Sequence, residues 1–226
     1  MGLGLSDPRE RAVVFADFDG TITAHETFVA MLRRFAPELS AELIPEMYAL
    51  RVTLREGVRR ILESIPSASL PAIEASARAA PVRAGLNELL DFLDARAVPF
   101  VIVSGGLRVM VEATLGPLLA RARAAYAVDV SAGSPTLRVR SELEGGDELV
   151  SKVDAMALHP CRESVAVGDS VTDLNMALAA DLVFARDKLC GYLDERGVAY
   201  QSWGDFHDVR RELDRRWAAA EGTRAG

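Results

Sequence analysis

The stretch Val13–Thr23, VVFADFDGTIT, decides the fold. Its first half is apolar and β-branched, which is typical of a buried strand. Two aspartates, Asp17 and Asp19, follow one residue apart. Because a buried carboxylate without a partner is costly, we expect both side chains at the open end of the strand or beside a positive charge.

The composition is that of an ordinary globular protein. The chain has 226 residues, is 50% hydrophobic, and carries Lys+Arg 26 against Asp+Glu 33, for a formal net charge of −7. This length suits one large domain or a domain with an insertion. The negative charge argues against nucleic acid or an anionic membrane as the main partner, since both favour basic patches. A small anionic substrate stays open.

Targeting and cysteine signals are weak. The two cysteines, Cys161 and Cys190, are isolated and have no zinc-type spacing. The N-terminal sequence lacks the pattern of a secretory signal, and no apolar run reaches the roughly 18 residues of a membrane span. We therefore expect a cytoplasmic protein, monomeric or homodimeric, with a frayed end over residues 218–226.

Short apolar runs alternate with helical patterns along most of the chain. The runs with strand character are Ala12–Phe18, Pro99–Gly106, Glu163–Asp169 and Ala180–Ala185. Helical spacing of leucines and other apolar residues marks Gly85–Arg96, Leu149–Leu158 and Val171–Ala180. Continuous hydrophobicity suits strands buried on both faces, so the pattern predicts an α/β fold with a Rossmann-like doubly wound parallel sheet. Ligands bind such sheets outside the carboxyl ends of the strands.

Residues 26–81 interrupt this alternation. They show only helical patterns, punctuated by prolines, and several successive helices exceed what one crossover needs. We predict a small helical cap domain over residues 25–81, inserted after the first strand into a core domain of residues 1–24 and 82–226. Hinges are expected near Thr23–His25 and Pro81–Ala84. A hairpin or edge strand is expected within Tyr126–Glu148.

The polar residues that follow the predicted strands converge on one edge of the sheet. They are Asp17 and Asp19, Ser104 with its two glycines, Asp169 and Asp173, and Lys152 at the start of a helix. Neighbouring carboxylates repel one another unless they share a cation, and Mg²⁺ binds through carboxylates, waters and substrate phosphate. One carboxylate could attack phosphorus while the second protonates the departing oxygen and later activates water.

These residues resemble the four motifs of the haloacid-dehalogenase-like phosphatases, in order and on the predicted elements. The matching stretches are DFDGT (17–21), VSGG (103–106), Lys152 and GDSVTD (168–173), and the resemblance spans about Val13 to Phe184. It implies that Asp17 is the nucleophile and Asp19 the general acid/base. It also implies a Mg²⁺ site formed by Asp17, Asp169 and the backbone carbonyl of Asp19.

The same resemblance assigns the phosphate contacts. Ser104 and Lys152 would bind the phosphoryl group, together with the backbone at Gly105 and Gly106. Asp173 would support the metal or position Lys152. The substrate is expected to be a small phosphomonoester. Phosphomutases share both aspartates and stay open, as does a catalytically silent module that only binds phosphate esters.

Two branches of the family compete for the substrate. The C-terminal third is similar to the methionine-salvage phosphatases of 2-hydroxy-3-keto-5-methylthiopentenyl-1-phosphate, notably in DLVFARD (181–187) and DFHDVRREL (205–213), and this branch is the preferred hypothesis. A Cys-rich segment expected before the lysine in some of these enzymes is missing. In phosphoserine phosphatases a glutamate at the position of Glu26 binds the substrate amine, and Arg59 would bind its carboxylate. Their usual GDGAND-type fourth motif is absent here.

Overall fold

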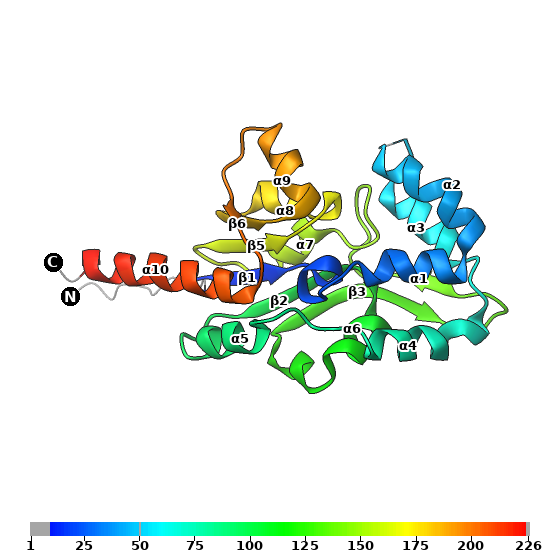
Figure 1. Ribbon diagram of the computed structural model, residues 1–226, viewed down its shortest axis with the longest axis horizontal. Coiled ribbons are helices and arrows are strands. Elements are labelled where there is room, and N and C mark those ends of the chain that lie inside the picture. The colour runs from blue at the N-terminus through cyan, green and yellow to red at the C-terminus, as the bar shows by residue number, and fades with distance from the viewer. Residues whose placement is uncertain (1–9, 50, 225–226) are drawn as a thin grey trace, which may run out of the picture.

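The computed structural model describes residues 10–49 and 51–224. Within these residues seven strands form one sheet in the order β4-β3-β2-β1-β5-β6-β7 (Figure 1). The strands are β1 Val13–Ala16, β2 Phe100–Leu107, β3 Ala124–Ser131, β4 Arg138–Arg140, β5 Ser164–Gly168, β6 Leu182–Ala185 and β7 Gln201–Ser202. Neighbouring strands run parallel except β3 and β4. The central position of β1 explains its continuous hydrophobicity, and the predicted parallel α/β sheet is confirmed.

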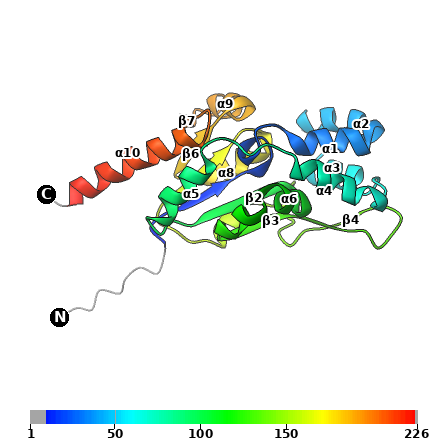
Figure 2. The ribbon, with the colours of Figure 1, turned by 60° about the horizontal axis from the view of Figure 1, so that its bottom comes forward.

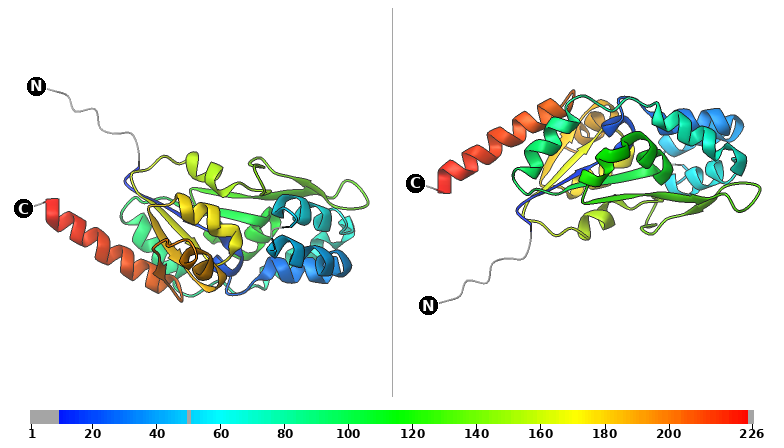
Figure 3. Two further views of the ribbon diagram at one scale, coloured as in Figure 1. Left: turned by 90° about the horizontal axis from the view of Figure 1, so that it is seen from above. Right: turned by 90° about the horizontal axis from the view of Figure 1, so that it is seen from below.

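Helices cover both faces of the sheet. Figure 3 shows one face covered by α7 Lys152–Ala157, α8 Leu174–Ala179 and α9 Asp187–Asp194, and the other by α5 Leu86–Asp94 and α6 Arg108–Leu115. The last helix, α10 Phe206–Arg224, packs against α5 and then extends past the end of the sheet (Figure 1). The fold is therefore doubly wound, as predicted. The expected frayed end is wrong up to Arg224, and the last two residues lie outside the described part.

Four of the five α-helices between β1 and β2 form the helical insertion. They are α1 Thr27–Phe35, α2 Pro37–Tyr48, α3 Leu54–Leu62 and α4 Leu70–Arg78, and they gather at one end of the molecule (Figure 2). Thr23 and Val82 form an antiparallel bridge, and Ala24 N–H donates to the Pro81 carbonyl at 2.9 Å. The two linkers to the helical insertion thus pair with each other where the sequence predicts hinges. The division into a cap domain and a core stays a prediction.

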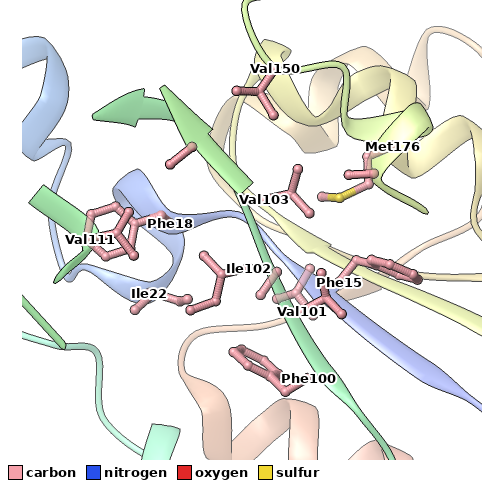
Figure 4. Packing of buried hydrophobic residues seen from close by; sticks show 14 of the residues in the cluster. Phe15, Phe18, Ile22, Phe100, Val101, Ile102, Val103, Val111, Val150 and Met176 are labelled. Atoms are coloured by element: carbon pink, nitrogen blue, oxygen red, sulfur yellow. The ribbon is translucent and has the colours of Figure 1, made fainter. Parts of the chain in front are cut away.

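The hydrophobic core continues into the loop that follows β1. All four residues of β1 are buried, and Phe18 and Ile22 belong to the same buried cluster as Phe15 and Ile102 (Figure 4). Phe18 is 2% exposed, so the residue between the two aspartates is anchored in the core. Since alternate side chains of an extended chain point to opposite sides, Asp17 and Asp19 face away from that core.

The region after β2 partly matches the prediction. β3 and β4 form the antiparallel pair expected within residues 126–148. β3 also pairs in parallel with β2, an addition to the sheet that was not predicted. Within the described residues, no helix combines the length and the apolar character needed to cross a membrane.

Candidate active site

The two aspartates after β1 are held by different partners. Asp17 N–H donates to the Val167 carbonyl at 2.9 Å, which fixes the end of β1 against β5. Asp19 Oδ1 accepts hydrogen bonds from Thr27 N–H and Thr27 Oγ1, each at 2.5 Å, and from Phe28 N–H at 2.8 Å. These donors form the first turn of α1, so Asp19 joins the loop after β1 to the helical insertion. Burial raises the pKa of Asp19 to about 6, although these hydrogen bonds oppose the shift.

Lys152 lies in a buried ion cluster at the end of β1. Its Nζ donates to Asp17 Oδ1 at 2.5 Å and to Asp173 Oδ1 at 2.6 Å, and its side chain is 1% exposed. Burial opposes the charge of Lys152, but the two carboxylates outweigh it and raise the lysine pKa. The loop after β5 holds Asp173 in turn, because Asp169 N–H and Ser170 N–H donate to its Oδ2 at 2.9 and 3.0 Å.

Asp169 completes a set of three buried carboxylates. One oxygen each of Asp17, Asp169 and Asp173 lies within 4.8 Å of the others. Burial raises the pKa of Asp169 to about 9, and the carboxylates of Asp173 and Asp17 add to that shift. Burial also raises the pKa of Asp17 to about 7, with Asp173 adding and Lys152 opposing. Once ionised, the three carboxylates outnumber the single charge of Lys152, and their oxygens could then hold a hard divalent cation.

Gly20 allows the loop after β1 to approach Asp169. Its φ is +85°, and a Cβ at this position would lie 2.5 Å from Asp169 Oδ2. The neighbouring Thr21 Oγ1 donates to Asp169 Oδ1 at 2.8 Å. The DGT sequence therefore serves two purposes, since its glycine makes room for the carboxylate and its threonine orients it.

The end of β2 supplies a polar turn. Ser104 is fully buried, and its Oγ accepts a hydrogen bond from Gly106 N–H at 3.0 Å. A Cβ on Gly106 would lie 3.2 Å from the Phe28 ring, so a small residue is favoured where β2 meets α1. Ser104 and the backbone of its two glycines face the same cavity as the aspartates.

One cavity of about 90 Å³ connects these groups with the helical insertion. The predicted site residues that line it are Asp17, Asp19, Glu26, Ser104, Gly105, Gly106, Lys152 and Asp169. Its apolar lining consists of Phe28, Val29, Tyr48, Leu54, Val58, Leu149 and Val150. The cavity is therefore polar at the sheet edge and apolar towards α1, α2 and α3.

Arg59 and Glu26, the two predicted contacts to the substrate's charged groups, each form an ion pair with another residue of the protein. Arg59 is not among the residues that line this cavity, and its guanidinium donates to Glu144 at 2.6 Å and to the Val139 carbonyl at 3.2 Å. Glu26 does line the cavity, and it lies 3.6 Å from Lys188 Nζ. Lys188 Nζ also lies 4.7 Å from the centre of the Tyr48 ring, so Glu26 and Tyr48 share one cation at the edge of the cavity.

Glu148 is a cavity residue that the sequence analysis missed. Its carboxylate accepts hydrogen bonds from Asn175 Nδ2 at 2.8 Å and from Lys152 N–H at 3.2 Å. The second contact caps the start of α7 and fixes the backbone of Lys152. Glu148 lies four residues before Lys152 and directly before a predicted helix, and this spacing could have suggested the capping contact. Nothing in the sequence indicates that Glu148 lines the cavity.

A family model described as haloacid dehalogenase-like hydrolase matches residues 14–178. The chain belongs to this family. It is 48% identical over 203 residues to a protein of Microcystis aeruginosa named 2-hydroxy-3-keto-5-methylthiopentenyl-1-phosphate phosphatase, covering 89% of this chain and 97% of the relative. It is 31% identical over 212 residues to the "Bifunctional enzyme MtnB/MtnX" of Bacillus licheniformis, covering 90% of this chain and 49% of that protein.

The fold of this haloacid dehalogenase-like hydrolase is also found in solved structures. The phosphoserine phosphatase of T. onnurineus matches with a TM-score of 0.69 at 18% identity, over 93% of this chain and 98% of the other. At that identity the match shows a shared fold. The choice between substrates therefore depends on the cavity and on the relatives of higher identity.

Proposed function

We propose that this protein is a Mg²⁺-dependent phosphatase of 2-hydroxy-3-keto-5-methylthiopentenyl-1-phosphate that acts in methionine salvage, a route of amino-acid biosynthesis. The observation that carries the proposal is the division of the cavity. A phosphoryl-transfer site at the sheet edge opens directly onto an apolar wall from α1, α2 and α3. The relative with 48% identity bears the name of this activity.

In the first step, an Asp17 carboxylate oxygen forms a bond to phosphorus. The bond between phosphorus and the enol oxygen breaks, and Asp19 gives its proton to that oxygen. Lys152 donates to Asp17 Oδ1 at 2.5 Å and so orients the nucleophile. Ser104 and the backbone N–H groups beside it would stabilise charge on the phosphoryl oxygens.

In the second step, the ionised Asp19 takes a proton from water. The resulting hydroxide attacks phosphorus, the bond to Asp17 breaks, and inorganic phosphate leaves. The hydrogen bonds from the first turn of α1 hold the Asp19 carboxylate at a fixed place for both proton transfers. Asp19 thus serves as acid and then as base.

The carboxylates of Asp17 and Asp169 fit a Mg²⁺ ion, and Asp173 lies beside them. Their oxygens lie within 4.8 Å of one another, and oxygen donors are what this cation prefers. When bound, Mg²⁺ supplies positive charge that offsets the charge of the phosphate and of the carboxylates. Asp17 and Asp169 are the proposed side-chain ligands, with the Asp19 carbonyl, and Asp173 holds Lys152.

The apolar wall suits the thioether tail of this substrate. Leu54 and Val58 come from α3, and Phe28 and Val29 come from α1. Burial of each CH₂ group contributes about 0.8 kcal/mol, so a methylthioethyl tail gains from such a wall. Closure of the helical insertion over the tail would also exclude bulk water while the phosphoryl group transfers.

Phosphoserine fits this cavity less well. Its carboxylate needs a guanidinium or a similar donor, and Arg59 is engaged by Glu144 and Val139 instead. Its amine could pair with Glu26 or Glu148, but its side chain offers nothing to the apolar wall. The structural likeness to phosphoserine phosphatases concerns the fold alone.

Phosphate release with Mg²⁺ tests the proposal on a panel containing the enol phosphate, phosphoserine and methyl phosphate. We expect the enol phosphate to have the highest kcat/KM. The variant Leu54→Ala should lower kcat/KM for the enol phosphate about 10-fold, because part of an apolar pocket is removed, and should leave methyl phosphate unaffected. A preference for phosphoserine would overturn the substrate, and no phosphate release from any ester would favour a binding module.

A further inference from the structure

Arg83 lies behind the candidate active site and contacts the loop that carries Asp19. Its guanidinium donates to four backbone carbonyl oxygens of that loop. The acceptors and distances are Gly20 at 2.5 Å, Thr21 at 2.7 Å, Thr23 at 3.2 Å and Ala24 at 3.3 Å. Arg83 itself belongs to the second linker, and its N–H donates to the Ile22 carbonyl at 2.8 Å.

The loop needs such a partner because its backbone is irregular. Asp19 departs from helical dihedral angles through its ψ of 115°, and Gly20 departs through its φ of +85°. Four carbonyl oxygens that point at one place repel one another unless a donor group lies between them. A planar guanidinium with five N–H groups can satisfy several carbonyls at once, which an ammonium on a flexible stem does less well.

The contacts of Arg83 continue to the other side of the site. Its guanidinium carbon lies 5.3 Å from the centre of the Trp203 ring. Trp203 Nε1 donates to the Gly168 carbonyl at 3.3 Å, directly before Asp169. One side chain therefore connects the loop of Asp19, the linker at Val82 and the segment that ends in Asp169.

We propose that Arg83 is a positioning residue for the phosphatase reaction: it fixes the loop of residues 20–24, and through it the place of Asp19 relative to Asp17. The proposal deepens the phosphoaspartate mechanism and rests on it. Arg83 does not line the cavity, so it acts through the loop and not on the substrate. Because this loop is also the first linker to the helical insertion, the same contacts fix the direction in which α1 leaves the sheet.

Arg186 offers a matched control. Its guanidinium carbon also lies 5.3 Å from the Trp203 ring, and it donates to the Gly204 carbonyl at 2.8 Å. Arg83 donates to that same carbonyl at 3.4 Å. The two arginines thus share the ring and one acceptor, whereas the bonds to residues 20–24 belong to Arg83.

The experiment compares Arg83→Ala, Arg83→Lys and Arg186→Ala with the unaltered protein. Steady-state turnover of p-nitrophenyl phosphate gives kcat, KM and the Mg²⁺ concentration for half-maximal rate. The backbone amides of Thr27 and Phe28 donate hydrogen bonds to Asp19 Oδ1. Their hydrogen-exchange rates give a second readout that needs no turnover. Circular dichroism checks that each variant is folded.

We expect Arg83→Ala to lower kcat about 100-fold, as a misplacement of about 1 Å does, with a small change in KM. Arg83→Lys should fall between it and the unaltered protein, and added guanidinium should restore part of the rate of Arg83→Ala. Both variants should exchange the Thr27 and Phe28 amides faster. Arg186→Ala should stay within about twofold in kcat.

Equal effects of Arg83→Ala and Arg186→Ala on rate and exchange would overturn the proposal. So would unchanged exchange in Arg83→Lys, the variant that keeps a cation and is available if Arg83→Ala does not fold. Inactivity of the unaltered protein on all phosphate esters would instead overturn the phosphatase function, and the exchange readout would still decide whether Arg83 fixes the loop.

Discussion

Replacing Gly20 by alanine tests how the geometry of the site affects turnover, and a comparison with Gly197→Ala separates this effect from a loss of fold stability. Gly20 has a φ of +85°, and an added Cβ would lie 2.5 Å from Asp169 Oδ2 and 3.0 Å from its Cγ. Gly197 has a φ of +64° and no atom within 4 Å of an added Cβ. The two alanine variants therefore share a backbone penalty, and the close approach to a carboxylate belongs to Gly20.

The magnitudes follow from these two observations. A residue with a Cβ in the left-handed region costs about 1–2 kcal/mol, so both variants should lose about that much stability. In Gly20→Ala, the Asp169 carboxylate must also move by about 0.5 Å to reach the shortest contact that a Cβ tolerates. Since misplacement by about 1 Å can cost 100-fold in rate, we expect a loss of about 10- to 100-fold in kcat.

The assay pairs urea unfolding with Mg²⁺-dependent turnover of p-nitrophenyl phosphate. Gly197→Ala should show the stability loss with a rate within about twofold of the unaltered protein. Gly20→Ala should show both losses, with a higher Mg²⁺ requirement because Asp169 is a proposed ligand. If both variants kept the full rate, the close approach of Gly20 to Asp169 would have no catalytic meaning and the reasoning would be wrong.

Three further predictions concern the charged groups of the site. Asp17→Asn should abolish phosphate release while circular dichroism shows a folded protein, and Asp19→Asn should slow it about 10²- to 10⁴-fold; near-normal rates in either would remove that residue's assigned role. Lys152→Met should destabilise the metal-free protein by about 3–5 kcal/mol in urea unfolding, because it leaves buried carboxylates without their cation; a smaller loss than in an exposed Lys188→Met control would contradict this. Burial raises the pKa of Asp169 to about 9 and that of Asp17 to about 7. The protonated forms of both groups therefore stabilise the metal-free fold. This contribution is fully present below about pH 4, the pKa range of an unfolded aspartate, and is lost as the pH rises through the raised pKa values. Mg²⁺ must displace these protons, so its dissociation constant in calorimetry should fall from about pH 6 to about pH 9, and a constant value would contradict the raised pKa values.

Much of the fold could be predicted because burial on both faces leaves a simple pattern. β1, β2, β5 and β6 are continuously apolar and separated by helical spacing, so their order and parallel arrangement follow from general rules. β3 was harder to recognise, since Ala124–Ser131 is rich in alanine and only partly buried. β7 has two residues, too few for any periodicity.

The candidate site could be predicted where its residues follow strands. The ends of parallel strands meet at one sheet edge, which explains why Asp17, Ser104 and Asp169 line one cavity. Arg83 could not be predicted in this way, because it binds backbone carbonyls about 60 residues away and such acceptors have no signature in the sequence. The surroundings of Arg59 were equally hidden, since Glu144 lies 85 residues further on.

The course of α10 bears on how this protein could be joined to another one. The first described residues and the end of α10 lie at the same end of the molecule, opposite the helices α1 to α4 (Figure 1). Residues of α1, α2 and α3 line the cavity, so neither described end of the chain lies beside it. The architecture thus suits fusion to a second enzyme. Protein molecules attached to a solid support through α10 would have the cavity directed away from the support.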